Sequence, residues 1–392
     1  MTVHDVTAPA GLLDPAFYAD LDAMHLALAD LRTHGPVVRD TPTDLVAVVG
    51  HTAVIDAEHR SADFVSGQGY RSVRDPNESS MIAQDDPGHA QQRRLISKRF
   101  TPRAVRELEP LIRRVARSLV DELASWGRCE VVNDLAAPLP AHLTAHLLGF
   151  PDERWPDIRS WSERLMRIDS MPHDADIAAG VIGACEEYAP QLLGIAERRW
   201  ACPANDLISV WTDAGMSNRR MFYETGLFIS GGAETTRTAI SRGLRILCDH
   251  PDEWERMAKE PSSIPVAVEE LLRWVSPLNN MFRTATNETT LAGVPIAAGD
   301  RLVLLYPSAN RDEAVFDDPF RFDAQRTPNP HVAFGFGTHF CLGASLARLE
   351  LRIVLEELTS RITALEPLTE PDIEANIFVG AVRSFELGFA AR

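Results

Sequence analysis

One cysteine of the chain stands in a setting that could support metal chemistry. It lies in the stretch Phe334-Gly-Phe-Gly-Thr-His-Phe-Cys341-Leu-Gly343, directly ahead of a helical pattern. Glycines allow a tight loop with positive φ and the close approach of another body. A cysteine that enters a helix N-terminus meets free N–H groups and the positive end of the helix dipole, which favour its thiolate. Cys341 therefore suits the role of a soft axial metal ligand, and a buried structural cysteine in a turn is the alternative.

A second candidate for chemistry lies inside a long helical pattern, in the run Gly231-Gly-Ala-Glu234-Thr235-Thr236. Two glycines inside a helix cost roughly 1 kcal/mol each relative to alanine, so their presence needs a reason. The hydroxyl of Thr235 can donate to the carbonyl of Gly231, four residues earlier, and so bend the helix. The alternative is a solvated Glu234 beside a threonine that the helix merely tolerates.

Charged side chains also occur at spacings that bring them together. Glu270 and Arg273 lie three residues apart, and therefore share one face of a helix. His89 and Arg93 lie four residues apart, also on one face, and Arg283 follows the helix of the first pair. Cations grouped in this way can bind carboxylates. Each of these residues taken alone is equally typical of a solvated surface.

A mainly helical scaffold must position these residues. Apolar residues recur with helical spacing over most of the chain, and prolines end several of the runs. Strand patterns are short and few. We expect helices at Pro102–Trp126, Met221–His250, Pro265–Val275 and Leu342–Ile362, strands at Leu45–Val49, Thr289–Ile296 and Arg301–Tyr306, and a polar loop at Val65–Gln84. That loop is either a binding loop or a plain surface excursion. The fold class is therefore mainly α with small peripheral β-sheets.

The composition is that of a folded globular protein and excludes several functions. The 392 residues are 45% apolar and 24% charged. The net charge of −17 argues against nucleic acids and anionic membranes as main partners, because both attract basic surfaces. No stretch approaches the about 18 apolar residues that a membrane span needs. Residues 1–10 lack the pattern of a signal peptide, so we expect a cytoplasmic protein.

The other cysteines show no sign of a shared site. The five cysteines are widely spaced, and no Cys-x-x-Cys motif occurs. This argues against a disulfide framework, a structural zinc site and a covalently attached c-type haem. Ordinary reduced thiols are expected at Cys129, Cys185, Cys202 and Cys248.

The pattern around Cys341 resembles the haem-binding loop of bacterial cytochromes P-450. Phe, Gly, Gly, His, Cys and Gly at these offsets would arise by chance about once in a million chains. The resemblance implies that Cys341 is the proximal thiolate ligand of a b-type haem, a ligand that pushes electron density toward O–O cleavage. It also implies that Phe334 packs beneath the loop. Further haem contacts are implied for His89, Arg93, Arg283 and His339, which would meet the propionates, and for Gly231, Gly232 and Gly343.

Other segments are similar to the same family in the expected order, from about residue 85 onward. By this resemblance, Glu234 and Thr235 form an acid–alcohol pair that relays protons to dioxygen. The family's fold would place the haem between the helix Met221–His250 and the helix after the Cys loop. We expect residues 1–392 to form a single domain, with a β-containing portion over roughly residues 1–85 packed on the helical remainder. The departure from the pattern is Gly231, where many relatives have alanine.

The resemblance gives Glu270 and Arg273 a structural role. In the family, such a Glu-x-x-Arg pair belongs to a buried network behind the haem loop. A third member comes from the segment that contains both Arg321 and Arg326. The sequence does not decide between these two arginines.

The implied reaction is monooxygenation. One atom of O2 is inserted into an unactivated C–H bond of an apolar substrate, and the other leaves as water. The chain carries no flavin or iron–sulfur signature, so electrons from NAD(P)H would arrive through separate partners, a small ferredoxin and its reductase. A local basic face would steer an acidic ferredoxin, and ordinary solvated helix faces are the alternative reading. Its residues would be Arg94, Lys98, Arg99, Arg103, Arg348 and Arg352.

The resemblance also implies an apolar substrate pocket. By family position, it should be lined by the loop Val65–Gln84 and by the segments Leu227–Ala233, Leu278–Phe282 and Ile377–Val379. The lining residues expected from these segments are Leu227, Phe228, Ala233, Asn280, Met281, Phe282, Phe378 and Val379. Asn279 and Asn280 could orient a polar group of the substrate. Several motifs look most like those of actinobacterial cholesterol side-chain hydroxylases, which favours a steroid or lipid side chain as substrate. The alternative is a natural-product tailoring hydroxylase or epoxidase for a terpene, polyketide or macrolide, and a non-catalytic haem electron-transfer or sensor protein is a remote one.

Overall fold

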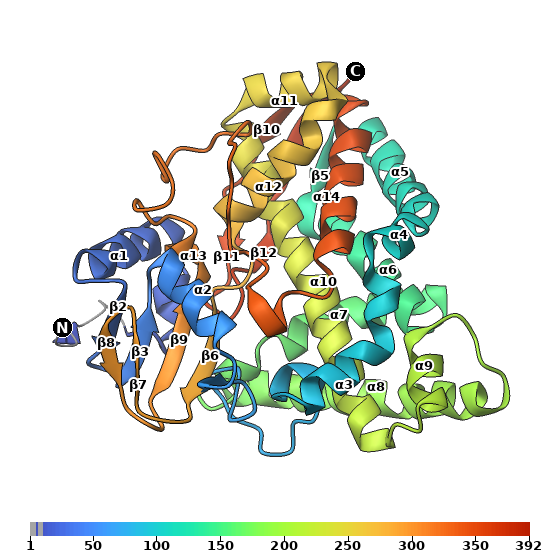
Figure 1. Cartoon of the computed structure of the whole chain (residues 1–392). Coiled ribbons are helices and arrows are strands. Elements are labelled where there is room, and N and C mark those ends of the chain that lie inside the picture. Colours follow the sequence, from blue (N-terminus) through green and yellow to red (C-terminus); the bar gives the residue numbers. More distant parts are fainter. Residues whose placement is uncertain (1–4, 7–10) are drawn as a thin grey trace.

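Long helices form the body of the molecule, and its largest sheet lies at one side (Figure 1). The computed structural model describes residues 5–6 and 11–392. The N-terminal stretch from which the lack of a signal peptide was predicted therefore lies almost entirely outside the described residues. Among those residues, every helix is too short or too polar to cross a lipid bilayer. The prediction of a mainly helical protein with small sheets is confirmed.

The helix α10 (Asn218–Cys248) crosses the middle of the molecule (Figure 1). The hydroxyl of Ser217 caps its start by accepting a hydrogen bond from the N–H of Arg220 at 3.4 Å. Both ends of α10 lie within three residues of the predicted bounds. The helices packed against α10 are α6 (Pro138–Leu148), α7 (Trp155–Leu165), α8 (Ala175–Ala201), α12 (Ile264–Val275) and α14 (Ala344–Thr359).

The helix expected over residues 102–126 is divided in two. α4 (Pro102–Arg106) ends just before Leu108, and α5 (Glu109–Trp126) begins after it. Pro110 explains the new start, because proline lacks the N–H that a continuous helix would need and fits the first turn. The remaining helices are α1 (Leu21–Thr33), α2 (His51–His59), α3 (Gly88–Ile96), α9 (Leu207–Asp213), α11 (Pro251–Lys259) and α13 (Tyr306–Ala309), joined in places by single turns such as η8 (Gly337–His339).

The largest sheet joins strands from distant parts of the chain. Its six strands lie in the order β1-β2-β3-β9-β6-β4. The expected strands near residues 45 and 301 are present as β3 and β9, which pair in parallel. The sheet therefore packs the N-terminal portion against the segment around residues 280–305. The strands are β1 (Asp5–Val6), β2 (Val37–Asp40), β3 (Leu45–Val48), β4 (Phe64–Val65), β6 (Asn280–Ala285) and β9 (Arg301–Leu305).

Smaller sheets complete the fold. The stretch Thr289–Ile296, expected as strand around a turn at Gly293, is a hairpin, with Ala292 and Gly293 at φ of 50° and 78° in the turn. Two further small sheets lie near the C-terminus. The strands are β7 (Thr289–Leu291) with β8 (Val294–Ile296), β11 (Asp372–Ile373) with β12 (Val382–Ser384), and β10 (Ile362–Pro367) with β13 (Glu386–Ala391) and β5 (Arg128–Glu130).

Candidate active site

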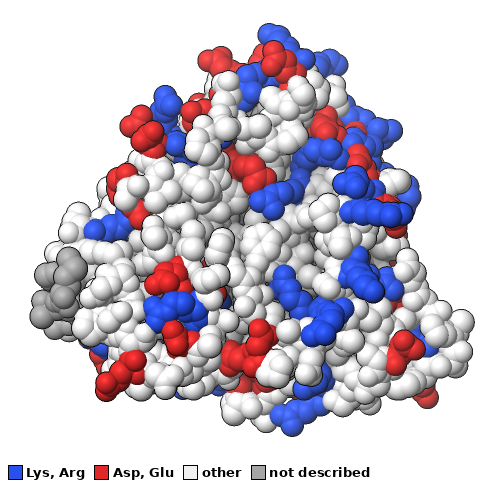
Figure 2. Space-filling model, in the orientation of Figure 1, with Lys and Arg blue, Asp and Glu red and all other residues white. Residues whose placement is uncertain are grey.

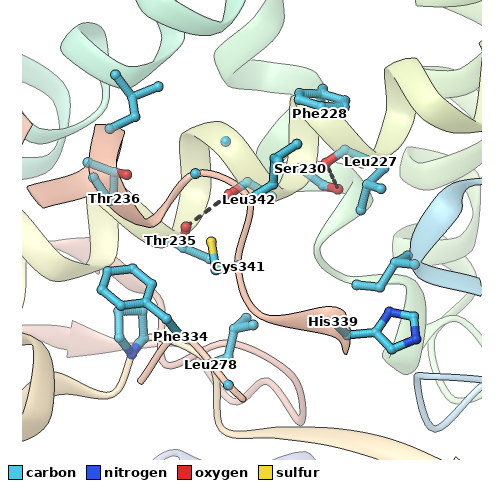
Figure 3. A pocket seen from close by; sticks show the side chains of 18 of the residues that line it. Leu227, Phe228, Ser230, Thr235, Thr236, Leu278, Phe334, His339, Cys341 and Leu342 are labelled. Atoms are coloured by element: carbon cyan, nitrogen blue, oxygen red, sulfur yellow. Dashed lines mark hydrogen bonds between the residues drawn. The ribbon is translucent and has the colours of Figure 1, made fainter. Parts of the chain in front are cut away.

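One cavity gathers most of the residues that the sequence singled out. α10 forms one wall, the Cys loop (residues 334–343) faces it, and α3, β6 and α14 contribute further side chains (Figure 3). Figure 3 shows Cys341 and Thr235 in the same part of the cavity and His339 at its far side. The expected residues that line it are Leu227, Phe228, Gly231, Gly232, Thr235, Met281, Arg283, Phe334, His339, Cys341, Gly343, His89, Arg93 and Phe378.

The Cys loop turns sharply because of its glycines. Gly335 and Gly337 have φ of 67° and 64°, in the left-handed region that favours glycine. A Cβ atom on Gly337 would lie 2.5 Å from the carbonyl oxygen of Glu58, so this position has no room for a side chain. The N–H of Cys341 donates to the carbonyl of Phe334 at 2.9 Å and closes the loop. The cysteine sulfur is thereby held at the cavity.

Two opposing effects act on the Cys341 thiol. Burial raises its pKa, and this effect is the largest. The backbone N–H groups of Gly343 and Ala344, together with Arg93 and Arg348, act in the opposite direction. The helix α14 begins at Ala344, so the sulfur sits just ahead of its N-terminus, as the sequence predicted. The thiol of the bare protein thus holds its proton, and binding of a cation would release it.

Four side chains that can carry positive charge meet at one end of the cavity. The rings of His89 and His339 lie 4.2 Å apart, and Arg93 and Arg283 line the same space. Burial, followed by Arg283, His89 and Arg93, lowers the pKa of His339 to about 2. Burial and Arg93 also lower the pKa of His89, against a weaker pull from Asp86. The buried Nδ1 of His89 makes no hydrogen bond within the described residues and lies 3.6 Å from Oδ1 of Asp86.

This arrangement fits a haem. Two guanidinium groups and two imidazoles converge here, and the two propionates of a haem would give them carboxylates to bind. Among residues 5–6 and 11–392, no three metal-binding side chains come together to hold a bare metal ion. Cys341 would therefore bind an iron whose other ligands a macrocycle supplies. The largely apolar walls of the cavity suit the macrocycle itself.

Thr235 and the two glycines shape the α10 wall. The hydroxyl of Thr235 donates to the carbonyl of Gly231 at 2.9 Å, the contact that the sequence spacing predicts. A Cβ atom on Gly231 would meet no protein atom within 4 Å, so this glycine opens space. A Cβ atom on Gly232 would lie 2.9 Å from Oγ1 of Thr144, so this glycine lets α10 approach α6 closely. The two glycines thus have different functions.

Glu234 does not share the cavity with Thr235. Thr235 is part of the lining of the cavity, whereas Glu234 is not. Glu234 is 2% exposed and accepts from Nη2 of Arg237 at 2.7 Å. Burial raises its pKa to about 7 in spite of Arg237, and the nearby Glu163 adds to the increase. The acid of the expected pair therefore lies behind the wall that carries the alcohol.

The substrate side of the cavity is apolar, but four expected lining residues lie elsewhere. In β6 the side chains alternate, so Met281 faces the cavity while Asn280 and Phe282 face the protein core. Asn280 donates to the carbonyl of Ile377 at 2.7 Å, and Asn279 donates to that of Asn376 at 3.0 Å. The two side-chain amides thus bind backbone carbonyls near the C-terminus, and neither amide faces the cavity. The other two residues outside the lining are Ala233 and Val379, which are 4% and 0% exposed.

Several lining residues were not expected from the sequence. Arg71 lies in the polar loop of residues 65–84, pairs with Asp169 at 2.7 Å, and stacks 4.0 Å over the ring of Phe378. The resemblance implied that this loop would line the pocket, but it did not single out Arg71. Glu58 and Glu350 carry carboxyls to the cavity from α2 and α14, and nothing in their helical patterns distinguishes them from surface residues.

The structure decides which arginine completes the buried network. Arg273 and Glu270 are fully buried and 2.7 Å apart. Arg326 approaches Glu270 to 3.2 Å, with its side chain 9% exposed. Arg321 is 67% exposed and pairs with Asp323 instead. The third member is therefore Arg326.

Comparison with known proteins places this site in a family. Residues 205–376 match the sequence model described as Cytochrome P450. The chain is 38% identical over 370 residues to a Steroid C26-monooxygenase of Mycobacterium tuberculosis, covering 92% of both chains.

Solved structures agree with the sequence comparison. A Mycobacterium marinum cytochrome P450 in complex with pseudoionone superposes with a TM-score of 0.90 at 31% identity, covering 98% of this chain and 99% of that one. A Bacillus megaterium protein of the same kind, in complex with testosterone, gives 0.86 at 29% identity, covering 95% and 99%.

Proposed function

The chain belongs to the cytochrome P450 family and is a haem-dependent monooxygenase, and from this premise we propose that it hydroxylates the side chain of a steroid or a similar lipid. The observation that carries the proposal is the 38% identity to a steroid C26-monooxygenase across 92% of the chain. An apolar cavity agrees with it, because a sterol offers few polar groups for recognition.

In this proposal the protein binds and orients, and the cofactor provides the oxidising centre. When bound, the haem supplies the iron at which dioxygen is activated for insertion into a C–H bond. Cys341 would bind the iron, and His89, Arg93, Arg283 and His339 would bind the propionates. The apolar side chains of the cavity would hold the substrate chain against the reacting centre and exclude water.

The chain's own proton relay would start behind α10. Glu234, with a pKa of about 7, can both hold and release a proton at neutral pH. Thr235 keeps its hydroxyl at the cavity by donating to Gly231, which leaves the oxygen free to accept a hydrogen bond from the cavity side. We infer that Glu234 must turn from Arg237 to deliver its proton to this hydroxyl.

Electrons would come from NAD(P)H through a ferredoxin and its reductase. The basic face expected for such a partner carries Arg94, Lys98 and Arg103 as exposed cations without a carboxylate partner among the described residues. Arg348 and Arg352 on the same face are paired with Glu269 and Glu109. Figure 2 shows Lys and Arg side chains gathered over α3, α4, α5 and α14, with acidic side chains between them. An acidic ferredoxin would be steered to this face.

A binding panel tests the substrate class. The haem-loaded protein is titrated with cholest-4-en-3-one, testosterone, a long-chain fatty acid and a macrolide, and the low-to-high-spin shift of the haem spectrum is recorded. We expect the sterol with an intact side chain to give the largest shift, and its product to carry one added oxygen on the side chain. A shift with the macrolide alone would favour natural-product tailoring and overturn the proposal.

The haem ligand is tested separately. The reduced protein treated with carbon monoxide should show the red-shifted Soret band of thiolate-ligated haem, and Cys341→His should abolish it. Cys202→Ser, a change at an exposed cysteine, is the matched control and should leave the band intact. A sensor or electron-transfer protein would bind haem but give no oxygenated product.

A further inference from the structure

A buried carboxyl that no part of the proposed reaction uses lies at the propionate end of the cavity. Glu58, near the end of α2, lines the cavity with its side chain only 2% exposed. Its Oε1 accepts a hydrogen bond from the hydroxyl of Tyr306 at 2.8 Å and lies 3.4 Å from Nη2 of Arg283. Its Oε2 is buried and has no regular hydrogen-bond partner among the described residues, although the N–H of Phe336 lies near the carboxyl. One oxygen is therefore fixed by Tyr306, and the other lacks a regular hydrogen bond.

The surroundings of Glu58 leave its charge only partly balanced. Arg283 reaches it from β6, Tyr306 from α13, and the Cys loop contributes His339 to the same cavity. The strand β7 also packs on α2 and carries only Thr289, Thr290 and Leu291 there, none of them charged. Arg283 is thus the one cation in direct contact with the Glu58 carboxyl among the described residues.

Burial raises the pKa of Glu58 above its ordinary value. Arg283, the hydroxyl of Tyr306 and the N–H of Phe336 oppose this effect without cancelling it. Arg283 is also a proposed propionate partner, so a bound haem would bring a second carboxylate to the same guanidinium. Two carboxylates that share one cation repel each other, and one of them then keeps a proton more tightly.

We propose that Glu58 is a second carboxyl partner of Arg283, and that gain or loss of its proton adjusts the reduction potential of the haem iron. The inference rests on the proposed haem site. An ionised Glu58 adds negative charge at the cavity and disfavours the added electron, whereas the neutral acid does not. Reduction by one electron from the ferredoxin is then accompanied by transfer of one proton from water to the Glu58 carboxylate. The added proton compensates the charge of the added electron, and no covalent bond of the protein chain is broken.

The experiment measures the midpoint potential of the haem-loaded protein as a function of pH, with dithionite as the reductant and no substrate. In the wild type we expect the potential to fall as the pH rises through the titration of Glu58. Glu58→Gln keeps the side-chain volume and removes the ionisable group. It should lose this part of the pH dependence and hold a higher potential than the wild type at alkaline pH.

A second variant keeps the test decisive if Glu58→Gln binds haem poorly. Tyr306→Phe removes only the hydroxyl that stabilises the ionised carboxyl, so the fall in potential should move to higher pH. A change in Glu313, an acid on the outer surface paired with Arg32, is the control, and Glu313→Gln should leave the curve unchanged.

The outcomes separate this inference from the function. A carbon monoxide band typical of thiolate-ligated haem, together with potential curves that coincide in the wild type, Glu58→Gln and Tyr306→Phe, would overturn the role of Glu58 alone. Absence of that band in the wild type would overturn the haem site, and the inference with it. A structural role for Glu58 would change haem retention but would not move the curve along the pH axis in Tyr306→Phe.

Discussion

The hydroxyl of Thr235 points its proton to Gly231 and its oxygen to the cavity. Replacement by alanine removes the oxygen while leaving the helix intact, since alanine is the best helix former. For Thr235→Ala we expect product formed per NAD(P)H consumed to fall several-fold and hydrogen peroxide to rise correspondingly. Thr235→Ser, which retains the hydroxyl, should stay close to the wild type. Unchanged coupling in Thr235→Ala would refute the relay role.

Glu350 gives a prediction about stability and pH. Its carboxyl is buried on α14 with no charged partner in the part of the chain that the structure describes, and burial raises its pKa to about 8. Because the folded-state pKa lies above the unfolded one, the protonated acid is tolerated at low pH, and stability is lost as the pH rises toward 8. Glu350→Gln should therefore become more stable relative to the wild type from pH 5 to 8, by on the order of 4 kcal/mol at most.

The measurement is the thermal midpoint of the haem-loaded protein at several pH values. The gap between Glu350→Gln and the wild type should widen with pH. A constant gap would mean that the carboxyl stays protonated or finds water throughout this range. The exposed Glu366→Gln provides a control for the general effect of removing an acid.

At the residue scale, residues that belong to a rare sequence spacing could be predicted. The direction in which a side chain points from its helix could not. The Cys loop could be predicted from the residue spacing around Cys341. The role of Thr235 could be predicted from its position four residues after Gly231. Glu234 is adjacent to Thr235 in sequence, but it pairs with Arg237 and is not part of the cavity lining. Glu58 is invisible in the sequence because a glutamate in a helix usually faces water.

The glycines of α10 give a matched pair of predictions at the scale of the element. Gly231→Ala meets no protein atom and gains helix propensity, so it should stabilise the bare fold by about 1 kcal/mol. Gly232→Ala gains the same propensity but presses on Thr144 of α6, so it should stabilise less or destabilise. Chemical unfolding of both variants measures the difference. Equal effects of the two substitutions on stability would show that Thr144 of α6 can move away from the added methyl group at little cost.

The network behind the Cys loop gives a second pair. Arg326→Met leaves the fully buried Glu270 with one cation fewer and should cost about 3 kcal/mol of unfolding free energy. Arg321→Met removes an exposed side chain and should change stability by less than about 0.5 kcal/mol. Comparing their denaturant midpoints checks the assignment, and a reversed order would contradict it.

Helices in which apolar residues recur with a clear period could be predicted from the sequence. A strand that is buried on both faces could not, because it has no such period. The helices α10, α12 and α14 have strong periodicity and lie close to their expected bounds. The strand β6 was not expected, because nearly all its residues are buried and no alternation between apolar and polar residues marks it. The division between α4 and α5 was also missed, although Pro110 stands at the break.

At the scale of the whole molecule, the chain carries a net charge of −17, but the face proposed to meet the ferredoxin is locally basic. Lys98→Glu should slow reduction by an acidic ferredoxin several-fold at low salt, and the difference should vanish at high ionic strength. Lys259→Glu on α11 makes the same change of net charge elsewhere and is the control. Stopped-flow reduction measures both. Equal slowing in the two variants would show that only the total charge matters.

The global architecture followed from the resemblance more than from the pattern of elements. Periodicity indicated a mainly helical chain but not which helices would meet. Contacts such as β3 with β9 join residues about 250 positions apart, and no local signal encodes them. The substrate walls combine residues of α6, α10 and β6 with the loop near Phe378 for the same reason.

The cavity's walls come from both ends of the chain, which has a consequence for how the protein is made. Arg93 donates to the carbonyl of Phe340, 247 positions later, and Glu58 meets Arg283, 225 positions later. When translation has just completed α10, the chain still lacks Arg283, His339 and Cys341, three of the five residues proposed to hold the haem. The proposed haem site is therefore complete only once Cys341 has been synthesised, so the cofactor would be captured late in translation or after it.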